Sequence, residues 1–90
     1  MRLVEMIEEY MDREIKGDLD LHSDEYGVDI SIFWASPTIN LSWYPIIQVD
    51  DDDGNVILHR EGPENPGRWL LWMLDTLKNY HDGDDWWYVY

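Results

Sequence analysis

The chain has 90 residues, of which 20 are acidic and six are basic, so its formal net charge is −14 at pH 7. This charge excludes direct binding to nucleic acid, which requires Lys and Arg to neutralise phosphates, and it disfavours anionic membranes. Hydrophobic residues make up 44% of the chain and include six Trp and six Tyr, which predicts a folded domain with an anionic surface.

The length predicts a single domain spanning residues 1–90. The chain has no cysteine, which excludes disulfides and thiolate metal sites and favours a reducing compartment. The first residues lack the apolar run of a signal peptide, and no stretch approaches the roughly 20 apolar residues that cross a bilayer. We therefore expect a cytoplasmic protein with no membrane partner, in the host cytoplasm if a phage encodes it.

Residues 3–16 are predicted to form an amphipathic helix that ends at Gly17. Apolar residues recur at helical spacing on one side, and acidic residues form a ridge on the other. Arg13 and Lys16 each follow a ridge acid by four residues, which predicts two local ion pairs. The acidic ridge consists of Glu5, Glu8, Glu9 and Asp12.

Three strands of an antiparallel meander are predicted over residues 26–34, 39–49 and 56–60, because apolar and polar residues alternate there. The connection before them, residues 18–25, is either a short edge strand or a loop, since its only apolar residues are two leucines. This connection contains a second acidic cluster, formed by Asp18, Asp20, Asp24 and Glu25.

The second and third predicted strands carry two local signals. Pro45 cannot donate to a sheet ladder, so it predicts an edge position or a bulge. Gly54 follows four consecutive aspartates and predicts a tight hairpin turn. After the turn, Val56 and Leu58 are expected to point inward. The aspartates of this turn form the third acidic cluster, which consists of Asp50, Asp51, Asp52 and Asp53.

A second helix is predicted from Asn65, as N-cap, and Pro66, as first helical residue, to about His81. The alternating tail, residues 84–90, is a possible fourth strand. The fold class is therefore α+β: a two-layer domain with a helix, a three-stranded antiparallel meander, a helix and a possible C-terminal strand. If both helices cover one face, the other face is a contact surface with Asp29, Ser31, Phe33, Asn40, Ser42, Tyr44, Ile57 and His59.

The tryptophans divide into two groups. Trp86 and Trp87 are adjacent, so in a strand they point to opposite faces, and one is expected to be an exposed anchor for a partner. The other four lie in strongly periodic segments, and we expect at least two of them in the core. These four are Trp34, Trp43, Trp69 and Trp72.

The sequence gives no indication of catalysis or of a bound metal or cofactor. The four-aspartate turn partly matches a calcium loop, but Val49 and Arg60 stand where two of its acidic ligands belong. No nucleophile elbow and no glycine-rich phosphate loop is present. Three isolated histidines lack zinc-ligand spacing. They are His22, His59 and His81.

Charge on a rigid scaffold is therefore the predicted working feature. Duplex DNA carries one charge about every 1.7 Å of axis, and rows of carboxylates imitate such a backbone. We expect a non-enzymatic acidic inhibitor, of the nucleic-acid-mimic type, that docks on a basic nucleic-acid-binding protein such as an effector or nuclease. The three acidic clusters and the two terminal tryptophans are the candidate partner-binding residues, with the helix ridge first and the four-aspartate turn next.

In composition and element order the chain resembles the small acidic phage proteins that inhibit CRISPR or restriction systems. The resemblance rests on no motif, so no residue role follows from it. Two alternatives stay open. One is an immunity protein that neutralises a basic nuclease or deaminase toxin. The other is a halophile housekeeping domain whose acidity serves hydration only, which would unfold at low salt.

Overall fold

The computed structural model describes residues 3–14, 16–24, 26–36, 43–78 and 88–89. It confirms the α+β class, with a helix before the strands, a helix after them and a short strand near the C-terminus. The elements are α1 (Leu3–Asp12), β1 (Leu19–Ser23), β2 (Val28–Ala35), β3 (Tyr44–Asp51), β4 (Val56–Glu61), the 3-10 turn η1 (Pro66–Arg68), α2 (Trp69–Leu77) and β5 (Tyr88–Val89).

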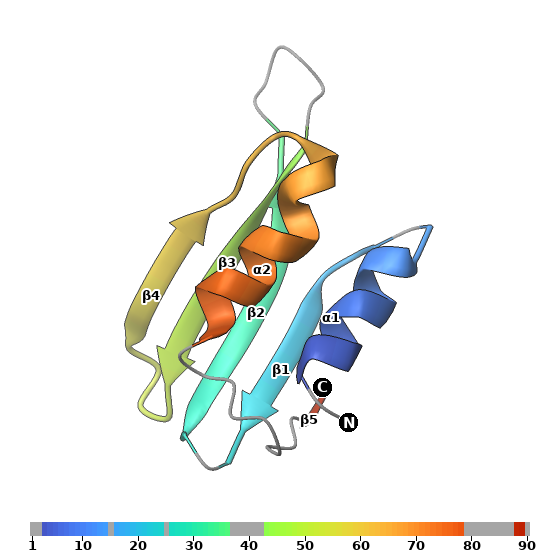
Figure 1. The fold of residues 1–90 in the computed structure, drawn as a ribbon. Coiled ribbons are helices and arrows are strands. Elements are labelled where there is room, and N and C mark those ends of the chain that lie inside the picture. The colour runs from blue at the N-terminus through green and yellow to red at the C-terminus, as the bar shows by residue number, and fades with distance from the viewer. Residues whose placement is uncertain (1–2, 15, 25, 37–42, 79–87, 90) are drawn as a thin grey trace.

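The strands form one antiparallel sheet in the order β4-β3-β2-β1-β5. Figure 1 shows both helices on the same face of this sheet, with α2 across β2 and β3 and α1 beside it over β1. The two-layer prediction is therefore confirmed. The face of the sheet away from the helices is called the open face below.

The core lies between the helices and the apolar face of β1, β2 and β3. Alternate residues of these strands point to the helices, as the period of two requires. From the helices, α1 contributes three core side chains and α2 contributes two. The core cluster is Met6, Ile7, Tyr10, Leu19, Leu21, Val28, Ile30, Ile32, Ile47, Val49, Met73 and Leu77.

One polar contact ties α1 to β2 at the edge of this core. The hydroxyl of Tyr10 donates to the carbonyl oxygen of Gly17, and the indole N–H of Trp34 donates to the Tyr10 hydroxyl over 2.6 Å. Burial raises the pKa of Tyr10, so the hydroxyl stays protonated and keeps its hydrogen bond. Because the hydroxyl has both a donor and an acceptor partner, these hydrogen bonds compensate for its removal from water.

The first helix ends at Asp12, four residues earlier than predicted. Beyond it the chain folds back so that the Gly17 carbonyl reaches Tyr10, a tertiary contact that helical periodicity does not reveal. The ammonium of Lys16 donates to the carbonyl of Arg13 over 2.9 Å and satisfies an acceptor just past the helix end. The predicted boundary at residue 16 is therefore wrong.

The acidic connection contains a true strand, β1, and this strand is not at an edge. It pairs with β2 along its whole length and with β5 on the other side. The exposed edge is β4, where five of six residues are exposed and one is partly buried. The prediction of an edge strand or loop for residues 18–25 is corrected accordingly.

Pro45 lies in β3, which is an interior strand and not an edge. Its carbonyl accepts a hydrogen bond from the backbone N–H of Gly62 over 2.7 Å. In an antiparallel ladder the nitrogen and oxygen of one residue face the same neighbour, so the proline nitrogen also faces the end of β4. The last residue of β4 that pairs with β3 is Glu61, so the N–H group that Pro45 lacks would lie just beyond the end of the ladder.

The bulge lies elsewhere, between β3 and β4. Val49 pairs with Leu58 and Asp50 pairs with Val56, so Ile57 is an extra residue on β4. This extra residue turns Val56 to the open face, where its side chain is 55% exposed, and the inward prediction for it is wrong. Leu58 packs against the core as predicted.

The second helix begins as predicted from its cap. The Asn65 side chain accepts from the backbone N–H of Gly67 over 3.0 Å, and Pro66 opens the short 3-10 turn before α2. The predicted extension to His81 falls outside the described residues.

Two leucines on α2 provide a matched test of this packing. Leu77 is fully buried, whereas the side chain of Leu71 is 74% exposed. Leu77→Ala should lower the free energy of unfolding by about 2–5 kcal/mol, because it removes core contacts and leaves a cavity. Leu71→Ala should change it by less than about 0.5 kcal/mol. Urea unfolding followed by circular dichroism measures both, and equal effects would contradict the placement of α2.

Candidate functional site

Two turns meet at one end of the sheet, as Figure 1 shows for the connections β1–β2 and β3–β4. They are in contact, because a Cβ built on Gly27 would lie 2.9 Å from a carboxylate oxygen of Asp52. Gly27 also has a φ of +62°, so a side chain there would be strained as well as crowded. This contact brings together acids that the sequence places in separate clusters. We call this group the acidic end: Asp24, Asp29, Asp50, Asp51, Asp52 and Asp53.

A row of three polar residues crosses the open face at the acidic end. His22 of β1 lies opposite Asp29 of β2, and Asp29 lies opposite Asp50 of β3. Two carboxylates that face each other directly across strands destabilise a sheet. Gln48 offsets part of this cost, because its side-chain amide donates to Asp50 over 3.2 Å. The sequence prediction placed Asp29 on this face but did not include it among the site residues.

His22 contacts two carboxylates of the acidic end. Its Nδ1 lies 2.6 Å from a carboxylate oxygen of Asp29, and its Nε2 lies 2.7 Å from one of Asp24. The side chain is only 20% exposed. The hydrogen bond to Asp29 raises the pKa of His22, with the Asp24 carboxylate acting in the same direction against the opposing effect of burial. A protonated His22 donates from both ring nitrogens.

Asp51 has a structural role within its turn. One carboxylate oxygen accepts from the backbone N–H of Asn55 over 2.8 Å and from that of Asp53 over 3.0 Å. These hydrogen bonds, that from Asn55 first, hold the pKa of Asp51 below its usual value. Asp52 and Asp53 are exposed, and the described part of the chain supplies no ion-pair partner for either. The four aspartates of the turn are therefore not equivalent.

The acidic ridge of α1 is a second, separate surface. Glu5, Glu8, Glu9 and Asp12 are all exposed. The predicted ion pairs with Arg13 and Lys16 do not form within the described residues, because the helix ends before the basic residues reach helical spacing. The Arg13 guanidinium instead lies 5.5 Å from the centre of the Tyr10 ring. The ridge lies on the helical layer, away from the open face.

The other predicted site residues are dispersed. Asp18 and Asp20 line a shallow depression of about 400 Å³ on the open face, together with Ser31, Phe33 and Gln48. Glu25, Trp86 and Trp87 lie outside the described residues.

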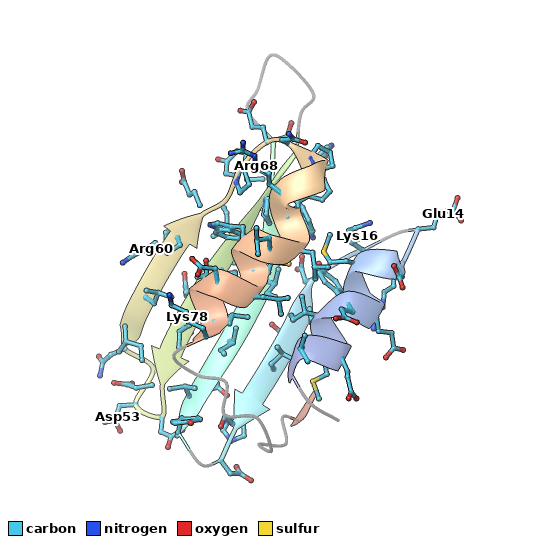
Figure 2. All side chains as sticks on the ribbon, viewed as in Figure 1. Glu14, Lys16, Asp53, Arg60, Arg68 and Lys78 are labelled. Carbon is cyan, nitrogen blue, oxygen red and sulfur yellow. The ribbon has the colours of Figure 1, made fainter. Side chains whose placement is uncertain are left out.

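None of the ion pairs formed by described Lys or Arg side chains involves an aspartate of the acidic end. Arg60 is opposite Ile47, which points to the helices, and Lys78 pairs with Asp75 over 3.4 Å. Figure 2 shows Asp53 at the tip of the β3–β4 turn, while Arg68 and Lys16 lie toward the other end of the molecule. Among the described residues, His22 is the cationic partner that contacts aspartates of the acidic end, and dissolved salt screens the remaining negative potential.

The early tryptophans form the margin of the core instead of its centre. Three of them, Trp34, Trp69 and Trp72, are partly buried and pack against it. Trp43 is 55% exposed and lies just before β3. The prediction that at least two would be core residues holds only in the sense that three contact the core, since none is fully buried.

The described residues contain no group of three His, Cys, Asp or Glu side chains arranged to hold a metal ion. None of their helices is long and apolar enough to cross a membrane.

Comparison of the chain with models of protein families, with curated proteins and with solved structures found no match. The interpretation of the site therefore rests on its own geometry and charge.

The pKa of His22 should depend on Asp29 more than on other acids of the acidic end. Asp29→Asn should lower it, since the hydrogen bond to this carboxylate is the largest cause of the upward shift. The matched control is Asp53→Asn, which removes one charge nearby without touching the ring. NMR titration of the His22 ring measures both, and an equal fall in the two variants would contradict the assignment.

The raised pKa of His22 makes the free energy of unfolding depend on pH. The folded pKa of His22 lies above its ordinary value of 6.5, so the folded state binds the proton more tightly. The stabilisation is complete below about pH 6.5, where both states are protonated, and it is lost as the pH rises through the folded pKa. The difference in unfolding free energy between the wild type and His22→Gln should therefore shrink as the pH is raised above about 6.5.

Asp51 and Asp53 should differ in their effect on stability, although each carries one charge in the same turn. Asp51→Ala should lower the melting temperature, because two backbone N–H groups lose their acceptor, and Asp53→Ala should leave it nearly unchanged. The pKa of Asp51 is lowered on folding, so its contribution should be lost as the pH falls through the folded value. Equal melting temperatures at neutral pH would refute the structural role.

Proposed function

We propose that the protein is a non-enzymatic inhibitor that presents its acidic end to a basic nucleic-acid-binding protein in place of nucleic acid. The observation that supports this most is the convergence of six aspartates from two hairpins on one end of a sheet. Arg68 and Lys16 lie toward the other end of the molecule, so they do not pair with these aspartates.

The spacing of the acids suits a surface that normally binds phosphates. Neighbouring strands lie about 4.8 Å apart, so Asp29 and Asp50 present carboxylates at close, regular separation. Each strand of duplex DNA carries a charge about every 3.4 Å of axis, which is a spacing of the same order. A cationic groove that binds DNA or this acidic surface gains free energy from the release of counterions. The long-range electric field of either ligand accelerates the encounter.

The cost of this arrangement also supports a role in binding. Asp29 and Asp50 are directly opposed, although a single neutral residue at either position would relieve the repulsion. Sequences depart from local stability rules mainly where function requires it. We place the acidic end before the helix ridge as the docking surface, because its acids converge from two hairpins. The ridge also carries like charges four residues apart, Glu5 with Glu9 and Glu8 with Asp12, but on a single helix.

The proposed partner is a CRISPR effector or a restriction nuclease of the cell in whose cytoplasm the inhibitor acts. Such proteins hold nucleic acid in a positively charged channel through its backbone and shape. A compact anion with carboxylates held on strands can occupy that channel without any catalytic step.

Two triple variants with the same change of charge test the proposal. Asp24→Asn/Asp52→Asn/Asp53→Asn should slow association with the basic target by about tenfold at 50 mM KCl, because steering depends on the local field. Glu5→Gln/Glu8→Gln/Glu9→Gln should slow it by less than about threefold, since the ridge lies on the helical layer. Biolayer interferometry against immobilised CRISPR nuclease–guide complexes and restriction endonucleases measures the rates, and a cleavage assay measures inhibition.

Three outcomes would contradict parts of the proposal. A larger loss in the helix variant would assign docking to the ridge. Binding to none of these basic proteins in dilute buffer, by a protein that circular dichroism shows to be folded, would remove the inhibitor function. Unfolding of the wild type at low KCl would instead indicate acidity that serves hydration.

A further inference from the structure

An aromatic pocket lies at the end of the sheet opposite the acidic end. It has a volume of about 590 Å³ and brings together four segments of the chain, of which three contribute a tryptophan. Trp34 stands near the end of β2, Trp43 just before β3, and Trp69 at the first turn of α2. Two of its remaining lining residues are the carboxylates Glu14 and Asp18. We call this group the tryptophan pocket.

Two of the three tryptophans in the pocket are held by contacts within the protein. The rings of Trp34 and Trp69 meet edge to face, with centroids 4.7 Å apart and an interplanar angle of 63°. The indole N–H of Trp34 donates to the Tyr10 hydroxyl, and that of Trp69 donates to the carbonyl of Pro63 over 2.9 Å. Two of the three indole donors are therefore used inside the protein, and the walls offer mainly π faces.

The rim offers acceptors. Asp18 and Glu14 are exposed, and neither forms an ion pair within the described residues. Lys16 also lines the pocket and keeps its positive charge, because its ammonium donates to the neutral carbonyl of Arg13, so the two acids leave the lining with a net negative charge. In Figure 2 the side chain of Glu14 extends away from the body of the protein, so we take Asp18 as the carboxylate to test. An anionic ligand is excluded by these two acids.

We propose that the tryptophan pocket binds the guanidinium group of an arginine side chain. This group is planar, carries only donors, is weakly hydrated and stacks on indole rings. It thus complements π walls and a carboxylate rim at once. An ammonium group is compact and strongly hydrated, and a neutral apolar group gains nothing from the charge of Asp18. The inference rests on the proposed function for the source of the arginine, which is the basic partner.

The pocket can be tested without the partner. The probe is N-acetyl-L-arginine amide, and its matched control is N-acetyl-L-citrulline amide, which has nearly the same shape without the charge. Indole N–H signals in ¹H–¹⁵N NMR spectra of the full chain report the site. We expect saturable shifts of the signals of Trp34, Trp43 and Trp69 with the arginine probe. Citrulline should bind at least about fivefold more weakly, given the usual size of a cation–π contact.

Two variants locate the binding. Trp43→Ala should weaken the arginine probe by about three- to tenfold, and because Trp43 is largely exposed the fold should survive. Asp18→Asn should weaken it while leaving the shape of the rim intact. Leu71→Ala removes an exposed apolar side chain that does not line the pocket and should have no effect. Unfolding curves confirm that each variant is folded, and if Trp43→Ala is not, Asp18→Asn decides.

The inference is overturned if citrulline binds as tightly as arginine, if no saturable shift occurs, or if folded Trp43→Ala and Asp18→Asn both keep full affinity. These results are independent of the partner assay. Binding of the probe by a protein that captures no basic protein would retain the pocket and remove the inhibitor function. Capture of a basic protein without binding of the probe would retain the inhibitor function and remove the arginine pocket.

Discussion

Burial of one face of β1, β2 and β3 beneath the two helices is the constraint on which the rest of the structure depends. Because successive side chains alternate between faces, the register that buries Ile30, Ile32 and Ile47 also turns Asp29 and Asp50 outward. A slip of one residue would exchange the two sets and bury carboxylates, which costs several kcal/mol for each unpaired charge. The hydrophobic core therefore fixes where the acids lie, and the charged surface follows from apolar packing.

A chain with a net charge of −14 folds only if its repulsion is distributed or used locally. The structure does both. The Asp51 carboxylate accepts hydrogen bonds from the backbone of its own turn. His22 forms hydrogen bonds to the carboxylates of Asp29 and Asp24. The remaining acids of the acidic end, with Asp52 and Asp53 the most exposed, face solvent where salt screens them. The acids thus differ in role although the sequence presents them as uniform runs.

The sequence correctly predicted the features that depend on residues close together in the chain. Alternation in β2 and the apolar phase of Ile47 and Val49 gave the correct inward faces, and Asn65 marked the start of the second helical segment. Errors arose where distant residues decide. The end of α1 depends on the contact between Tyr10 and Gly17, and the exposure of Val56 depends on a bulge set by pairing with β3. The acidic end was not predictable as one surface, because it requires the register of three strands.

The two proposed contact sites would contribute to binding in different ways because their physics differs. The acidic end is exposed and charged, so its contribution would act over a distance, accelerate the encounter and weaken with salt. The tryptophan pocket is concave and aromatic, so its contribution would require contact and would slow dissociation. They lie at opposite ends of β2, which runs from Val28 beside Asp51 to Trp34 beside Pro45. One partner that engages both must therefore present a basic groove together with a projecting arginine, which is a stricter requirement than positive charge alone.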